Sequence, residues 1–352
     1  MIGWNEIYKV VVAMAPLYVA LALGYGSIRW WKIFSKDQCD AVNRLVCYFT
    51  LPLFTFDFTA HIDPFHMNYL FIGGDAVSRL IVVVVLVFWA KLSNKGSYEW
   101  SITSCSLSTM TNSLIIGVPL LEAMYGKIGV DLVVQSSVLQ SILWFTILLF
   151  VLEVRRSGGS AEVVDSHTLP EDRTLEDLEA NEVSASSRLP FWSLMKKVWI
   201  KLAKNPNSYA CTLGVAWAFV AARWQLEMPS IMEKSVLIMS KAGTGTAMFS
   251  MGMFMAQQEK LIACGTRLTL LGMVLRFIAG PTAMAIGAIS VGLRGDVLRI
   301  AIIQAALPQA IASFIFAKEY GFHAEVLSTA VIFGMMVSLP VLIAYYAVLE
   351  LL

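Results

Sequence analysis

Apolar runs of bilayer length recur along this 352-residue chain, and they constrain its fold more than any other feature. A helix of about 20 apolar residues crosses the hydrocarbon core of a membrane. Only 14% of the residues are charged, whereas soluble domains carry roughly 25%. Because lipid offers no partners to backbone N–H and C=O groups, such runs must be helical. The sequence therefore predicts an all-α membrane protein embedded in a lipid bilayer.

The apolar runs form ten predicted transmembrane helices, five on each side of a segment of different composition. Residues 154–190 are rich in Asp, Glu and Ser and contain no aromatic residue, which is typical of a solvated, disordered linker. This predicts a first five-helix repeat at 1–153, a short linker at 154–190 and a second five-helix repeat at 191–352. Residues 191–204 open the second repeat as a basic amphipathic segment suited to an anionic membrane surface.

Lysine and arginine are concentrated in the joins after the first, third, fifth and seventh predicted helices. The positive-inside rule therefore places the linker in the cytosol and both termini on the opposite side. Because each half holds an odd number of helices, the two halves must run in opposite directions. The expected arrangement is a pair of inverted repeats.

The fourth predicted helix of each half has a polar centre. Residues 101–126 carry Asn112 among serines and threonines, and residues 297–318 carry Pro308, Gln309 and Ser313. Helices interrupted at mid-membrane free backbone N–H groups that can hold an anion, and pairs of them are typical of secondary transporters. We therefore expect Asn112 to lie where a broken helix binds a small organic anion. The alternative is that Asn112 only joins two helices by hydrogen bonds.

Asp75 and Arg79 lie four residues apart in the third predicted helix, so they share one face. One interpretation is an internal salt bridge that only stabilises the fold. The other is a support for the substrate region, in which the pair replaces a coupling ion.

Several classes of function are not expected. The five cysteines form no C-x-x-C pair and the four histidines show no metal-binding spacing, so neither a metal site nor a cofactor is predicted. A net charge of +1 gives no basic face for nucleic acid. The predicted spans contain no paired catalytic carboxylates and no Ser/His arrangement, so an enzyme is not expected.

Seven segments carry a resemblance to a known family. They are PLYVALALGYGS (16–27), FSKDQCDAVNRLV (34–46), SLSTMTNSLIIGVPLLEAMYG (106–126), VLQSILWFTILLFVLE (138–153), GTAMFSMGMFMA (245–256), AIIQAALPQ (301–309) and FAKEYGFHAEVLSTAVIFGM (316–335). They resemble the plant PIN-FORMED auxin efflux carriers across both membrane halves. The short linker is similar to that of the short-loop members.

The resemblance implies a fold of ten helices in two inverted repeats. Helices 1, 2, 6 and 7 would form a scaffold domain that supports a homodimer. Helices 3–5 and 8–10 would form a transport domain that moves by an elevator-type step, with helices 4 and 9 broken where they cross.

The resemblance also implies a substrate site. Asn112 would contact the substrate carboxylate, and Thr55 would present a hydroxyl to it. The remaining implied contacts are apolar at Leu51, Ile115 and Phe145 and polar at Gln140 and Asn207. Asp75 and Arg79 match the acidic–basic support pair of the family.

Two positions depart from the family pattern. Relatives carry proline at both crossovers, whereas this chain has Thr111 and Ser313. Their hydroxyls can bond back to helix carbonyls and bend the helix, so we expect the breaks to arise in that way. Phe145 also replaces a tyrosine and removes one hydroxyl from the site.

The implied function is transport of auxin, as the indole-3-acetate anion, out of the cytosol. The short linker implies the endoplasmic reticulum membrane and its lumen, with the plasma membrane as the alternative location. The spans show no carboxylate cluster of the kind that binds sodium or protons, so uncoupled uniport is expected. The alternatives are an ion-coupled carrier of another organic anion and a membrane receptor without turnover.

Overall fold

The computed structural model describes residues 4–93, 96–164, 191–258, 262 and 264–351. The first half is built from α1 (Trp4–Arg29), α2 (Lys36–Leu45), η1 (Val46–Thr50), α3 (Leu51–Ala60), α4 (Tyr69–Leu92), α5 (Tyr98–Thr109), η2 (Ser113–Gly117), α6 (Val118–Tyr125), α7 (Lys127–Leu139), η3 (Gln140–Trp144) and α8 (Phe145–Val164). The second half is built from α10 (Phe191–Lys204), α11 (Pro206–Trp224), α12 (Ser230–Gln257), α13 (Thr266–Val274), η4 (Leu275–Ala279), α14 (Gly280–Ser290), α15 (Gly295–Ala305), α16 (Ile311–Tyr320) and α17 (Ala324–Leu351). The η elements are single π-helical turns.

Within this described part, five helical stretches are long and apolar enough to cross a membrane. They are Ile7–Arg29, Tyr69–Leu92, Lys127–Arg156, Thr266–Ser290 and Ala324–Leu351. No β-strand occurs among the described residues, whose only β-type pairing is an isolated bridge between Thr111 and Gln309. The predicted class of an all-helical membrane protein is confirmed.

Three of the four π turns end two residues before a proline. The turns close at Thr50, Gly117 and Ala279, and the prolines are Pro52, Pro119 and Pro281. Proline donates no N–H, and its ring clashes with the carbonyl four residues earlier. One extra residue in the preceding turn relieves that clash, because a π turn widens the helix locally. The sequence therefore explains why these helices continue past their prolines with a bulge.

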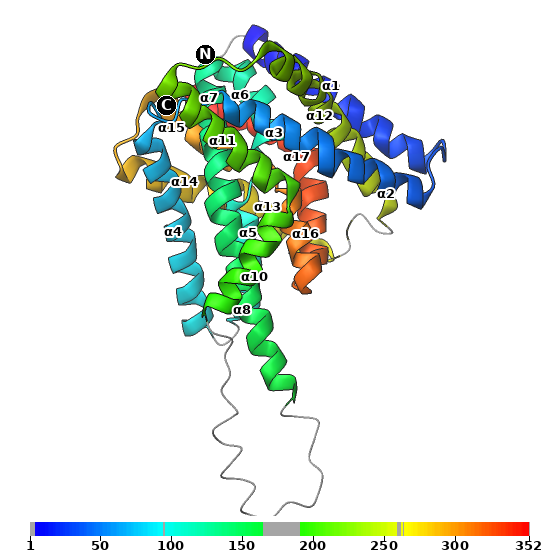
Figure 1. Ribbon diagram of the computed structural model, residues 1–352. Coiled ribbons are helices and arrows are strands. Elements are labelled where there is room, and N and C mark those ends of the chain that lie inside the picture. Colours follow the sequence, from blue (N-terminus) through cyan, green and yellow to red (C-terminus); the bar gives the residue numbers. More distant parts are fainter. Residues whose placement is uncertain (1–3, 94–95, 165–190, 259–261, 263, 352) are drawn as a thin grey trace, which may run out of the picture.

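The first helix group consists of α1, α2, α3, α11 and α12. In it, α1 lies along α12, and α3 contacts both α11 and α12 (Figure 1). The approach of α1 to α12 requires glycine, because a Cβ at Gly24 would overlap the carbonyl of Phe249 and one at Gly252 would overlap the carbonyl of Leu21.

The second helix group consists of α4 to α8 and α13 to α17. Here α4 packs against α14, and α17 contacts α13, α15 and α16. Its core contains fully buried side chains from both halves of the chain, such as Leu120, Ile300 and Val331. Residues distant in sequence are thereby brought to one place, where the two polar centres meet.

Helix α8 continues to Val164 and so passes the expected start of the linker at residue 154. No proline interrupts the chain before Pro170, so the helical hydrogen-bond ladder can run on beyond the apolar residues. The rest of the predicted linker, residues 165–190, lies outside the described residues. Helix α10 follows as a distinct element, with Val198 buried and Trp199 exposed, in agreement with an amphipathic segment.

Candidate functional site

The two polar centres are breaks between helices, and the broken ends bind each other. The first break lies at 110–112, between α5 and η2, and the second at 306–310, between α15 and α16. The N–H of Asn112 donates to the carbonyl of Pro308 over 2.9 Å, and the N–H of Ala310 donates to the carbonyl of Met110 over 3.1 Å. Backbone groups freed by one break are thus satisfied by the other, as buried polar groups must be.

Gln140 holds the first break from the side. Its Oε1 accepts from the N–H of Thr111 over 3.0 Å, and its Nε2 donates to the carbonyl of Thr111 over 2.6 Å. The carboxamide therefore replaces the helical neighbours that Thr111 lacks. Gln140 was expected to contact substrate, but in this conformation both polar atoms of its side chain are engaged by Thr111.

Buried glutamines from the second half complete the polar network. The Nε2 of Gln304 donates to the hydroxyls of Ser113 over 2.6 Å and Ser136 over 3.1 Å. The Nε2 of Gln309 donates to the carbonyl of Ser106 over 3.1 Å and to Ser313 Oγ over 2.7 Å. These side chains fix the two breaks relative to each other.

The two crossover hydroxyls behave differently. Ser313 lies inside α16, beyond the break, and its Oγ donates back to the carbonyl of Ala310 over 2.6 Å. The hydroxyl of Thr111 instead pairs with Ser113 Oγ over 2.6 Å and makes no back-bond to its own helix. Of the two crossover hydroxyls, only that of Ser313 therefore bonds back to a carbonyl of its own segment, and Pro308 lies within the same break.

Asn112 lies at the start of η2, where the second half of the broken helix begins. The residue is 9% exposed, and its Nδ2 has no hydrogen-bond partner among the described residues. The side chain does not cap its own helix. An unsatisfied buried amide is unfavourable by about 1–3 kcal/mol, so a ligand that accepts from this nitrogen would be stabilised here.

Two further expected site residues are joined in the first helix group. The hydroxyl of Thr55 on α3 donates to Oδ1 of Asn207 on α11 over 2.5 Å. The expected apolar residues lie in different clusters. Ile115 is in the main core with Leu51 packed against it, whereas Phe145 stacks edge-on against Phe316 with ring centroids 5.6 Å apart.

Asp75 and Arg79 form an ion pair on α4, with Nε and Oδ2 2.9 Å apart. The indole N–H of Trp144 donates to the same Oδ2 over 3.0 Å, and the Arg79 guanidinium lies 4.8 Å from the Trp144 ring centroid. Both charged side chains are buried. The opposite charges of Asp75 and Arg79 therefore cancel each other, and the hydrogen bond from Trp144 links the pair to η3.

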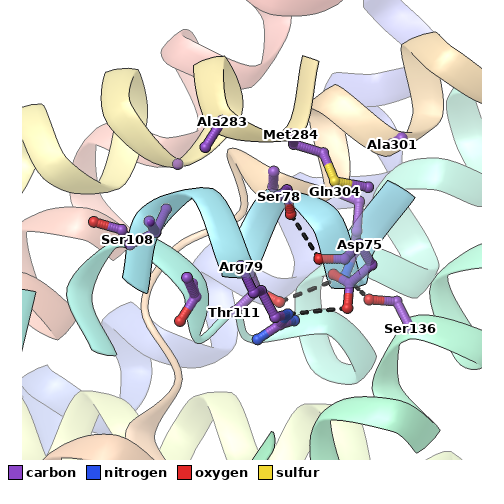
Figure 2. Close-up of a pocket in the computed structure, with 14 residues that line it drawn as sticks. Asp75, Ser78, Arg79, Ser108, Thr111, Ser136, Ala283, Met284, Ala301 and Gln304 are labelled. Carbon is purple, nitrogen blue, oxygen red and sulfur yellow. Dashed lines mark hydrogen bonds and ion pairs between the residues drawn. The ribbon is translucent and has the colours of Figure 1, made fainter. Parts of the chain in front are cut away.

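A polar hollow opens beside this pair. It is lined by Asp75, Ser78, Arg79, Val82, Ser108, Thr109, Thr111, Ser136, Gly280, Ala283, Met284, Ala301, Gln304 and Ala305. Figure 2 shows the side chains of Asp75, Arg79, Thr111 and Gln304 around one space, between α4 and the helices of the second half. Asn112, Thr55 and Asn207 do not line it, so the hollow lies on the Asp75 side of the crossing.

Sequence reasoning missed Arg276. It is fully buried on η4, and its guanidinium donates to the carbonyls of Leu107 over 3.1 Å and Met110 over 3.2 Å, and to that of Ala305. An arginine inside an apolar span was the available signal, because intramembrane charges are rare and functional.

Comparisons with known proteins show which proteins this chain is similar to. The profile of a family described as membrane transport protein matches residues 9–346. The chain is 66% identical over 350 residues to auxin efflux carrier component 5 of Arabidopsis thaliana, covering 99% of each chain. It is 58% identical to probable auxin efflux carrier component 5a of Oryza sativa subsp. japonica, covering 100% of this chain and 99% of the relative. It is also 40% identical to Arabidopsis thaliana auxin efflux carrier component 8, over the full length of both.

Proposed function

Because this chain belongs to the PIN-FORMED auxin efflux carriers, as a short-loop member, we propose that it carries auxin across a membrane as the indole-3-acetate anion. It is a multi-pass membrane transporter and not an enzyme. Relatives that share its full length are named auxin efflux carriers. At near-neutral pH the carboxylate of a weak acid is charged, so it needs a protein to pass the hydrocarbon core.

The observation that carries the proposal is the Nδ2 of Asn112, which has no hydrogen-bond partner in the described part of the chain. It sits at the break, where the helical segments η2–α6 and α16 begin. Helix N-termini carry a partial positive charge of roughly half a unit, and they bind carboxylates and phosphates. The substrate carboxylate accepts from Nδ2 of Asn112, while the indole ring lies against apolar residues such as Ile115 and Leu51. In the proposed site, the hydrogen-bonded side chains of Thr55 and Asn207 are the polar groups contributed by the first helix group.

The proposed architecture has ten crossings in two inverted repeats. Each half contributes one interrupted helix, Tyr98–Tyr125 in the first and Gly295–Tyr320 in the second. The first helix group corresponds to the scaffold and to the homodimer contact. The second helix group, which contains both breaks, moves as the transport domain in an elevator-type step. The contacts of α1, α3, α11 and α12 with one another support this division.

Transport is proposed to be uncoupled from sodium and protons. The carboxylate of Asp75 is already neutralised by Arg79 at 2.9 Å, so no cation is required to balance it. Flow then follows the anion gradient and the membrane potential. We place the protein in the endoplasmic reticulum membrane, with movement from cytosol to lumen, the linker cytosolic and both termini luminal.

The test is uptake of radiolabelled indole-3-acetate by the purified protein in proteoliposomes. A hydrogen bond to a charged group contributes about 1.5–3 kcal/mol, so Asn112→Ala should weaken apparent affinity about 10- to 140-fold. The matched control is Asn43→Ala, which removes an amide bonded to Ser250 in the first helix group. Normal transport by Asn112→Ala would refute the site, and absence of wild-type uptake would refute the function.

The hollow beside Asp75 favours one competing function, an ion-coupled carrier of the same fold. Replacing sodium with choline and collapsing the proton gradient should leave the initial uptake rate unchanged. A direct loss of uptake in either condition would establish coupling instead.

A further inference from the structure

Arg276 is a buried positive charge without a carboxylate partner. Its side chain is 0% exposed, and none of the ion pairs among the described residues includes it. The other arginine near the crossing, Arg79, is neutralised by Asp75. A charged side chain within a membrane needs compensation, and for Arg276 this comes from backbone carbonyls.

Those carbonyls are the ends of two interrupted helices. Leu107 O and Met110 O close α5, and Ala305 O closes α15. A helix C-terminus carries roughly −0.5 of an elementary charge. Two C-termini at one point therefore sum to about −1, which one guanidinium balances.

Carbonyls at the C-terminal ends of broken helices are also the ligands with which transporters coordinate a free sodium ion. Here an arginine donates to all three of them. We propose that Arg276 is a tethered cation, filling a monovalent-cation site at the crossing that would otherwise need an ion from solution. The part of this inference that concerns transport rests on the proposed function.

The backbone around Arg276 brings its guanidinium within reach of these carbonyls. Arg276 lies on the π turn η4, where the helix is widened ahead of Pro281. Gly280 is the first residue after η4, and a Cβ at this position would overlap the carbonyl of Ser108. The absence of that Cβ lets η4 and α14 approach the end of α5 closely enough for the guanidinium to reach its carbonyls.

The tethered charge has a consequence for an anionic substrate. Four helix ends meet at the crossing, two positive at η2 and α16 and two negative at α5 and α15. Without Arg276 the four partial charges would nearly cancel. With it, the negative ends are neutralised and the positive ends beside Asn112 remain to attract a carboxylate.

The test is whether a free cation can replace the tethered one. Arg276→Ala removes the guanidinium and leaves the three carbonyls, so millimolar guanidinium chloride should raise its thermal midpoint by about 2–4 °C. Arg276→Met fills the space with an apolar side chain and should show no such rise. Arg267→Ala, at an exposed position on α13, controls for general effects of guanidinium and should also show none.

This thermal shift needs no auxin, so it can be read even if the protein does not transport indole-3-acetate. If Arg276→Ala responds no more than Arg267→Ala, the cation site is refuted. If Arg276→Ala is too unstable to purify, Arg276→Lys and Arg276→Met are compared in proteoliposomes. Lysine should retain sodium-independent uptake, and methionine, which fills the space without a charge, should lose uptake with or without sodium. Uptake by Arg276→Met at the wild-type rate without sodium would overturn the proposal.

Discussion

Replacing Gln140 with methionine should lower the free energy of unfolding by about 2–6 kcal/mol. Methionine has nearly the same volume and shape, so the change leaves no large cavity. What is lost is the pair of hydrogen bonds to the backbone of Thr111, at 3.0 Å to its N–H and 2.6 Å to its carbonyl, and the bond that Oε1 accepts from the Thr111 hydroxyl over 3.2 Å. Thr111 is only 4% exposed, so bulk water has little access to the groups that lose their partners. Each buried group left unsatisfied is unfavourable by about 1–3 kcal/mol, which gives the stated range for two groups.

The measurement is denaturant unfolding of the purified protein in mixed micelles, with Gln135→Met as the matched control. Gln135 is a buried glutamine on α7, and among the described residues its side chain accepts one hydrogen bond, from the N–H of Asn68 over 3.0 Å. Its replacement should lower stability by about 1 kcal/mol. A loss at Gln140 no larger than that at Gln135 would show that the carboxamide does not hold the break.

Repeating the Gln140→Met change in a Thr111→Pro variant separates the hydrogen bond to the carbonyl of residue 111 from those that this residue donates. Thr111→Pro removes both the N–H and the hydroxyl that donate to Oε1 of Gln140, over 3.0 and 3.2 Å. Met110, at φ −89° and ψ 111°, already lies close to the conformation that precedes proline. In this background Gln140→Met should cost only the carbonyl bond, about 1–3 kcal/mol. The two effects should therefore couple by about 1–3 kcal/mol. An identical loss in both backgrounds would refute the reasoning.

Two further outcomes follow from the charged side chains. Asp75→Asn leaves Arg79 buried without its carboxylate and should lower stability by about 3–5 kcal/mol, most of it recovered by adding Arg79→Met; thermal melts of the four proteins test this. Burial lowers the pKa of Lys201, but its hydrogen bonds to Tyr320 and Glu319 outweigh burial and raise the pKa above its usual value. Its stabilising effect should therefore be complete at neutral pH and lost only as pH rises through that raised pKa. The difference in thermal midpoint between wild type and Lys201→Met should disappear only as pH rises through the raised pKa. A difference that disappears near pH 7 would contradict this.

The all-helical membrane class could be predicted from local sequence, and the π turns can be explained by it. Apolar length determines which segments cross a bilayer, and the prolines at 52, 119 and 281 explain three π turns. Pro308 lies in the second break. The spacing of Asp75 and Arg79 placed them on one helical face, and the structure joins them in an ion pair. All these features depend on residues within one or two helical turns.

The cause of the first helix break could not be predicted from neighbouring residues. Back-bonding by a hydroxyl is a local effect, and it was expected at both Thr111 and Ser313, but it occurs only at Ser313. At Thr111 the backbone is held instead by Gln140, 29 residues away. A glutamine on an apolar helix predicts a buried hydrogen bond without identifying its partner.

The sequence by itself determined that this is a helical membrane protein with two polar, breakable centres. Side-chain hydropathy and proline affect the helix in which the residue itself lies, so their effects can be predicted locally. Only the tertiary structure decided which groups meet there. Arg276 donates to carbonyls 166 and 169 residues away, and every residue has such a carbonyl. Because the backbone is the same at each position, no pattern of side chains indicates which carbonyls a folded helix end will leave for an arginine to bind.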